Sequence, residues 1–322
     1  MSAAAPLLEV SNLCATFAGA GREVRAVRGA SFTIEVGQTL GLIGESGSGK
    51  TVTGLAILRL LPAHASVSAD RIAYRGENLA AMSDDEFRRL RGVELGMIFQ
   101  DPAGSFNPAK RIGWHLREAI RRRGGEVERW EAEAGDMLRE VGIRMPQRVL
   151  GAYPHQLSGG MLQRALIAMV FLLRPALIIA DEPTTNLDNL VERQILALIR
   201  AHQAKVGAAI LFVTHDLGIA GALCDRIAVM YAGEIVEIGP AAAVLERPLH
   251  PYAQGLLATS RSLERADAEL HELPGEPGGV PPEQGCAFAP RCIHVMAACR
   301  ERHPAMTEVE PGHGARCLLH ER

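Results

Sequence analysis

The sequence lacks any apolar stretch long enough to cross a bilayer. Its most apolar run, residues 166–180, is interrupted by Arg174 and Pro175, whereas a membrane-spanning helix needs about 20 consecutive apolar residues. The N-terminal segment has no basic residues before its first apolar ones, so we expect no secretory signal. The chain is therefore expected to stay in the cytosol, where it can still dock on a membrane protein.

An excess of charge of either sign is also missing. The chain has 34 basic and 37 acidic residues, which give a net charge of −3. Proteins that bind nucleic acid usually carry a basic excess or a basic stripe, so no nucleic-acid partner is expected. A length of 322 residues and a hydrophobic content of 48% predict one large domain with a packed core and a second, smaller domain.

Cysteine is scarce, and its distribution is uneven. Six cysteines in a long cytosolic chain do not suggest a disulfide framework, but four of them fall in the last 37 residues, at Cys286, Cys292, Cys299 and Cys317. Four thiolates can hold a tetrahedral zinc ion or an iron–sulfur cluster. Their spacing lacks the short pairs of most structural zinc sites, and free cysteines packed around a loop are the remaining alternative.

Runs of apolar residues predict strands that alternate with helices. Buried strands are expected at 39–43, 95–99, 177–181 and 208–214, strands at 7–17 and 24–36, and a hairpin at 226–239 that turns at Ala232 and Gly233. Helical spacing is found at 51–61, 114–123, 130–141 and 187–199. This alternation predicts a mainly parallel sheet covered by helices on both faces.

A glycine-rich loop follows the predicted strand 39–43 and precedes a predicted helix. It fits the phosphate-binding pattern G-x-x-x-x-G-K-[ST] and consists of Gly44, Glu45, Ser46, Gly47, Ser48, Gly49, Lys50 and Thr51. Glycines let backbone N–H groups approach phosphates, and the helix N-terminus adds positive potential. We therefore expect ATP to bind here, with Lys50 on the β- and γ-phosphates and Thr51 on Mg²⁺.

Two carboxylates follow the buried strand 177–181. Ligands of open α/β sheets bind at the carboxyl ends of the strands, where Asp181 and Glu182 stand. We expect Asp181 to act on Mg²⁺ and Glu182 to deprotonate the attacking water. With the phosphate loop upstream, this pair predicts ATP hydrolysis.

A second candidate anion site begins at Ser158. Leu157-Ser158-Gly159-Gly160-Met161 is typical of a helix N-terminus that presents backbone N–H groups. Phosphoryl transfer within one subunit does not require a second site of this kind.

With these motifs the chain resembles the ABC ATPase family, whose signature is LSGGQ. The resemblance implies a P-loop α/β core with an N-terminal antiparallel β subdomain, a helical subdomain at about 101–165 and a small cysteine-containing C-terminal extension. It also implies roles for individual residues. Gln100 matches the glutamine that senses Mg²⁺ and water, and Asp188 matches the aspartate in the loop that follows the two carboxylates. His215 matches the histidine that contacts the γ-phosphate, and Phe17 matches the aromatic residue that stacks on adenine. Asn186 replaces the usual alanine before Asp188.

Longer phrases resemble the ATP-binding subunits of oligopeptide and dipeptide permeases. They are 100–108, Tyr153-Pro-His-Gln before the signature, Met230-Tyr-Ala-Gly233, His250-Pro-Tyr252, and in the tail Leu273-Pro-Gly-Glu-Pro277 and Pro290-Arg-Cys292. The resemblance places an ABC domain at 1–246 and the extension at 247–322, with a proline- and glycine-rich segment at 273–285. It implies a [4Fe–4S] cluster on the four cysteines in preference to zinc.

The resemblance also implies partners. These are a second, related ATPase chain that closes head to tail, so that Ser158 and Gly160 contact the partner's γ-phosphate, two membrane permease subunits and an external binding protein. The chain would then lie on the cytoplasmic face of the membrane. Alternatives are an importer of nickel or another small solute, a soluble ABC ATPase, which usually carries two cassettes, and a P-loop kinase, which would not need 157–164.

Overall fold

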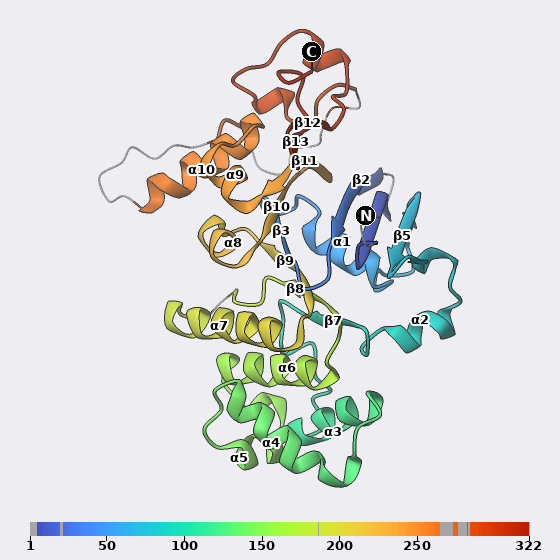
Figure 1. The fold of residues 1–322 in the computed structure, drawn as a ribbon, viewed down its shortest axis with the longest axis vertical. Coiled ribbons are helices and arrows are strands. Elements are labelled where there is room, and N and C mark those ends of the chain that lie inside the picture. The colour runs from blue at the N-terminus through green and yellow to red at the C-terminus, as the bar shows by residue number, and fades with distance from the viewer. Residues whose placement is uncertain are drawn as a thin grey trace. The chain divides into compact units, whose positions relative to one another are not determined.

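The computed structural model describes residues 5–19, 22–185, 187–264, 273–275, 282 and 284–321 (Figure 1). The chain divides into two compact units. The first consists of Met1–Ile34, Thr39–Ala80 and Phe212–Arg322, and the second of Glu35–Gln38 and Ala81–Leu211. Of the predicted segment 273–285, only 273–275, 282, 284 and 285 are described, and Asn186 lies outside the described residues.

The first unit contains an antiparallel sheet in the order β2-β1-β5-β6, with β4 also paired to β1. Its long strands run side by side, with Leu8 opposite Ile34, and Leu8, Leu13 and Ala15 are fully buried. This sheet confirms the expected antiparallel β subdomain. The strands are β1 (Leu8–Gly19), β2 (Arg22–Ile34), β4 (Ala65–Ser68), β5 (Arg71–Tyr74) and β6 (Glu77–Asn78).

The first unit also holds most of a second sheet, in the order β12-β13-β11-β10-β3-β9. All residues of β3 (Thr39–Ile43) are buried, as expected for a strand covered on both faces. The predicted hairpin is present, because β10 (Arg226–Tyr231) pairs antiparallel with β11 (Glu234–Pro240) and the turn residues Ala232 and Gly233 have φ of 46° and 86°. The remaining strands are β9 (Ala209–Thr214), whose first residues belong to the second unit, β12 (Thr307–Glu310) and β13 (His313–Ala315).

Helices and short 3-10 turns complete the first unit. They are α1 (Lys50–Ile57), α8 (Leu217–Leu223), α9 (Ala241–Glu246), α10 (Pro251–Glu264), α11 (Ala298–Glu301) and η4 (Ala289–Arg291), with η1 (Leu79–Ala81) at the division between the units.

The second unit combines two parallel strands with a group of helices. β7 (Leu95–Ile98) pairs with β8 (Leu177–Asp181), and β8 neighbours β9. Four helices, α3 to α6, pack against one another and form the green bundle in Figure 1. The elements are α2 (Asp84–Leu90), α3 (Ile112–Arg122), η2 (Val127–Arg129), α4 (Trp130–Glu140), α5 (Pro146–Gly151), η3 (Pro154–Gln156), α6 (Gly159–Leu173) and α7 (Asn189–Val206).

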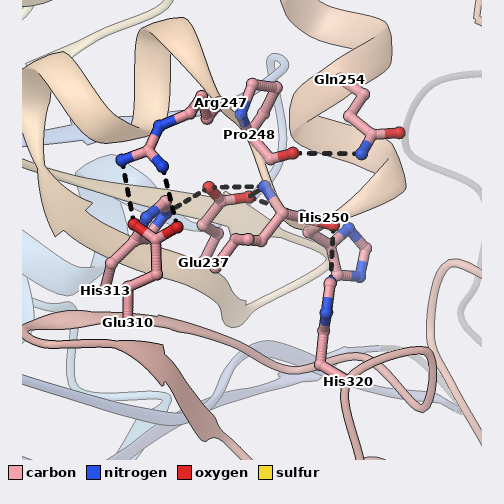
Figure 2. A network of polar contacts seen from close by, with 9 residues as sticks. Glu237, Arg247, Pro248, His250, Gln254, Glu310, His313 and His320 are labelled. Atoms are coloured by element: carbon pink, nitrogen blue, oxygen red, sulfur yellow. Dashed lines mark hydrogen bonds and ion pairs between the residues drawn. The ribbon is translucent and has the colours of Figure 1, made fainter.

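The C-terminal residues extend the second sheet of the first unit, and a buried polar network also joins them to that sheet. β13 pairs with β11, and Figure 2 shows Glu237 of β11 at the centre of the network. This carboxylate is fully buried and accepts hydrogen bonds from the N–H groups of Leu249 and His250, while His313 Nε2 lies 2.8 Å from it. Burial raises the pKa of Glu237, and these hydrogen bonds and His313 oppose the rise.

No helix among the described parts of the chain is both long enough and apolar enough to cross a membrane.

Candidate functional site

Two of the three glycines of the predicted phosphate loop, Gly44 and Gly49, lie where no side chain would fit. A Cβ atom on Gly44 would come within 2.2 Å of the Met230 carbonyl oxygen, and one on Gly49 within 2.3 Å of the Ala26 carbonyl oxygen. Gly49 also has a φ of 105°, a left-handed conformation that glycine adopts without a steric penalty. The loop is therefore pressed against neighbouring backbone, and its shape depends on these glycines.

Lys50 is the first residue of α1, and its ammonium group turns back over the loop. The side chain is buried at 5% exposure, and Nζ donates to the carbonyl oxygens of Gly44 at 2.8 Å and Glu45 at 2.9 Å. Thr51 follows on the exposed side of the helix. A loop of backbone N–H groups, a helix N-terminus and a positioned ammonium group form a chemically suitable phosphate site.

The other predicted nucleotide contacts of the first unit lie on a strand and after one. Phe17 lies on β1, half-buried, with its ring centroid 5.9 Å from that of His64. His215 is exposed directly after β9. The next residue, Asp216, caps α8 by accepting from the Ile219 N–H at 2.9 Å, which fixes the backbone beside the histidine.

In the second unit, β8 ends at the predicted carboxylates. Asp181 is 3% exposed, and Glu182 has a φ of 42°, a left-handed value that is uncommon for a residue with a side chain. Gln100 Nε2 and Thr185 Oγ1 both donate to Glu182 Oε2, at 3.1 and 2.8 Å. Gln100 and Glu182, which we predicted as separate functional residues, are therefore in direct contact, and Thr185 is a supporting residue that the sequence reading missed.

The signature segment forms the start of α6. Ser158 is its N-cap residue, with extended backbone, and α6 begins at Gly159. Ser158 and Gly159 are exposed, so this helix start is accessible to a ligand or a partner. Further along α6, Gln163 Nε2 donates to the Pro183 carbonyl oxygen at 2.7 Å and so connects the signature helix to the residues that follow Glu182.

Asp188 stabilises the N-terminus of α7. Its side chain caps α7 by accepting from the N–H groups of Leu190 and Val191, at 3.1 and 3.0 Å. An N-cap of this type stabilises a helix by about 1 kcal/mol.

The four C-terminal cysteines line one small cavity of about 10 Å³. Gly285 has a φ of 80°. The N–H of the next residue, Cys286, donates to the Cys299 carbonyl oxygen at 2.7 Å, which joins the segments that contain these two cysteines. Burial, with a smaller contribution from the nearby thiols of Cys299, Cys317 and Cys292, raises the pKa of the Cys286 thiol to about 11. Burial also raises the pKa values of Cys292 and Cys317, which favours protonated thiols unless a cation is bound.

The thiols are not arranged as metal ligands around one point. Within the described ranges, no group of three or more His, Cys, Asp or Glu side chains has such an arrangement. The cavity has room for about one water-sized atom.

Comparisons with known proteins agree with the site. Residues 27–185 match the family model for ABC transporters, and residues 236–299 match that for the C-terminal region of oligopeptide/dipeptide transporters. The chain is 43% identical over 318 residues to a probable peptide ABC transporter ATP-binding protein of Sinorhizobium fredii, which covers 97% of this chain and 94% of that protein. It is 42% identical over 319 residues to the oligopeptide transport ATP-binding protein OppD of Bacillus subtilis, covering 98% of this chain and 89% of OppD.

Solved structures agree on the fold. A dimeric post-hydrolysis ATP-binding cassette bound to ADP and Pi superposes with a TM-score of 0.63 at 25% identity, covering 73% of this chain and 98% of the cassette. The fold and the site thus define an ABC-type ATPase. The chain belongs to the ATP-binding subunits of ABC transporters, within the oligopeptide/dipeptide family.

Proposed function

We propose that this chain hydrolyses ATP to drive an importer of oligopeptides or dipeptides. The observation that carries the proposal is the pair of local sites: a glycine-dependent phosphate loop with Lys50 folded over it, and Glu182 held by Gln100 and Thr185. The substrate class is supported by the relatives, which are named for peptide, oligopeptide and dipeptide transport.

The phosphate loop and Asp181 carry ATP-Mg²⁺ in this proposal. The loop N–H groups and Lys50 bind the phosphates, and Phe17 stacks on the adenine. The Thr51 hydroxyl and the Asp181 carboxylate, directly or through water, are oxygen donors of the kind that Mg²⁺ prefers. When bound, the ion neutralises charge on the phosphates.

Glu182 is the proposed general base. Two donors on its Oε2 fix the orientation of the carboxylate, and a fixed carboxylate can accept a proton from a water molecule placed for attack on the γ-phosphate. Gln100 senses Mg²⁺ and water beside it, and His215 contacts the γ-phosphate.

The variant Glu182→Gln tests this assignment, because it keeps the shape of the side chain and removes its basicity. ATP binding is expected to persist, and steady-state phosphate release is expected to fall about 100-fold or more. Glu128→Gln, an exposed substitution in the same unit, is the control and should keep full turnover. Near-normal turnover by Glu182→Gln would refute the assignment of the base.

We further propose that Cys286, Cys292, Cys299 and Cys317 hold a [4Fe–4S] cluster, with zinc as the alternative. The proposal rests on four thiols that line one cavity, since a bound cation would offset the burial that raises the pKa values of three of them. Among the described residues they are not arranged as ligands around one point, so either group requires the thiols to move toward one another. The small cavity accommodates one metal ion, whereas a four-iron cluster requires the wall to expand.

Metal analysis of protein purified without oxygen separates these cases. A cluster predicts brown protein that contains iron and sulfide, with broad absorbance near about 400 nm. The serine variant of Cys299 should lose both, whereas the serine variant of Cys14, which lies on β1, should keep them. Colourless, iron-free protein removes the cluster, and one zinc per chain would replace it.

The proposed assembly contains a second ATPase subunit, a related but different chain, two membrane permease subunits and an external substrate-binding protein. In it, Ser158, Gly159, Gly160 and Asp188 of one ATPase subunit complete the ATP site of the other, and the chain lies on the cytoplasmic face of the membrane. We place the boundary between the ABC domain, 1–246, and the extension, 247–322, at Arg247. Limited proteolysis that yields no stable fragment ending near this residue would count against it.

A further inference from the structure

The second residue of the phosphate loop is tied to the C-terminal extension by a two-pronged ion pair. Arg291 Nη1 and Nη2 donate to the two carboxylate oxygens of Glu45, at 2.7 and 3.0 Å. The side chains are only 5% and 20% exposed, so solvent screens this pair less than a surface pair. Paired, charge-assisted hydrogen bonds of this geometry are strong and directional.

The guanidinium group of Arg291 is itself held in place. Its Nε donates to the Pro274 carbonyl oxygen at 2.7 Å, and its central carbon lies 5.7 Å from the ring centroid of Tyr231 and 6.0 Å from that of Phe288. The pair with Glu45 raises the already high pKa of Arg291, so the charge is permanent. Arg291 is therefore a rigid anchor that reaches the loop from η4.

A second residue of the extension holds the backbone of Glu45. The Glu45 N–H donates to the hydroxyl oxygen of Tyr252 at 2.9 Å. Tyr252 is fully buried in the first turn of α10, and its ring contacts those of Tyr231 and Phe288 at centroid distances of 4.7 and 5.4 Å. Both the side chain and the N–H of Glu45 are thus fixed by residues beyond the proposed domain boundary.

The third polar group of Glu45 faces the catalytic machinery. Its carbonyl oxygen accepts from Lys50 Nζ at 2.9 Å, so a shift of Glu45 would move one of the acceptors that orient this ammonium group. A continuous set of contacts therefore runs from Arg291 through Glu45 to Lys50, all within the first unit.

We infer that Arg291 and Tyr252 are positioning residues, which set the affinity for ATP by fixing the phosphate loop through Glu45. The inference rests on the proposed function, because it assumes that the loop binds ATP. It also assigns a function to three segments that carry the family resemblance but take no part in the proposed ATP hydrolysis. Tyr252, Pro274 and Arg291 come from these three segments, and all lie within one contact of Glu45 or of its anchor.

Loss of the anchor should leave the loop folded but less well organised for phosphate. The cost then appears mainly in ATP affinity, because binding must pay the entropy of ordering the loop. A purely structural link would instead lower thermal stability and leave the affinity of the folded protein unchanged.

The test measures the Kd of ATP-Mg²⁺ and the thermal midpoint of the full-length chain and its variants. Arg291→Ala and Glu45→Gln should each weaken ATP binding about tenfold. Arg291→Lys keeps the charge but cannot form the two parallel hydrogen bonds, so its ATP affinity should lie between those of these variants and the wild type. The double variant should bind no more weakly than the worse single one, because both remove the same contact. In turnover, the KM for ATP should rise more than kcat falls.

The matched control is Arg247→Ala. Arg247 makes the same two-pronged pair, with Glu310 at 2.9 and 3.0 Å (Figure 2), but its side chain and that of Glu310 are 66% and 39% exposed. It should leave ATP affinity unchanged. The inference fails if Arg291→Ala and Glu45→Gln both bind ATP within twofold of the wild type, or if their effects multiply in the double variant. A wild-type chain that binds no ATP would instead refute the proposed function.

Discussion

At the scale of single residues, the shape of the phosphate loop depends on the absence of side chains at two glycines as much as on the side chains that are present. Gly44 faces the Met230 carbonyl oxygen and Gly49 the Ala26 carbonyl oxygen, both atoms of backbone in sheets. Backbone in a sheet cannot move aside as the end of a flexible side chain can. The loop therefore has little tolerance for a single added carbon atom at these positions.

We predict that Gly44→Ala abolishes measurable ATP binding and destabilises the protein by about 1–3 kcal/mol, the usual cost of overpacking. The new Cβ would lie 2.2 Å from the Met230 oxygen, so residue 44 must move away from β10, which displaces the carbonyl oxygen that accepts from Lys50 Nζ. Thermal unfolding and ATP titration check this outcome. Gly151→Ala, where nothing lies within 4 Å of the added carbon, should leave both quantities close to the wild type; ATP affinity retained by Gly44→Ala would contradict the prediction.

The loop could be recognised from the sequence because its chemistry is local. Eight consecutive residues contain the glycines, the lysine and the helix start, so their spacing alone predicts a phosphate site. The contact between Glu45 and Arg291 spans 246 positions and follows no periodicity. Only the fold brings these two residues together, and the phrases that contain them indicated a family but no contact.

At the scale of elements, apolar runs predicted the buried strands well. The expected strands 39–43 and 177–181 coincide with β3 and β8, because a strand buried on both faces has a continuous apolar sequence. The hairpin β10–β11 was also predicted, since its turn contains a glycine. The C-terminal elements α10, β12 and β13 were not predicted. β12 has only partly buried or exposed residues, so it shows no apolar pattern.

Glu237 shows why a charged residue misleads such a reading. A glutamate in a strand is expected to face solvent, but Glu237 of β11 is fully buried. The burial is tolerated because two backbone N–H groups and His313 satisfy the carboxylate, as a buried charge requires. Those partners belong to segments 12 to 76 positions away, and the sequence gives no sign of them.

At the scale of the whole molecule, the predicted site residues divide between the two units. The phosphate loop and His215 belong to the first, whereas Gln100, Asp181, Glu182 and Ser158 belong to the second. The exposed start of α6 makes no side-chain cap hydrogen bond, and the proposed assembly uses it for the nucleotide of a neighbouring subunit.

We predict that the chain alone binds ATP but hydrolyses it slowly, and that its rate in the complex with the second ATPase and the permease subunits is at least about tenfold higher. The reason is that, in the proposed assembly, the partner supplies the N–H groups and the serine that complete the site on this chain's loop, and one such donor is worth about 100-fold in rate. Phosphate release per ATPase subunit, measured for the purified chain and for the complex isolated from membranes, checks this.

The variant Ser158→Ala identifies which site the signature serves. Introduced into a complex whose partner ATPase carries an inactivated base, it should leave turnover at this chain's own loop unchanged, because in the proposed assembly its serine acts on the partner's nucleotide. Introduced into a complex in which this chain carries Glu182→Gln, it should lower the remaining turnover, which takes place on the partner's loop. Equal loss in both complexes, or a purified chain that already hydrolyses ATP as fast as the complex, would contradict the shared site and place the whole reaction within one chain.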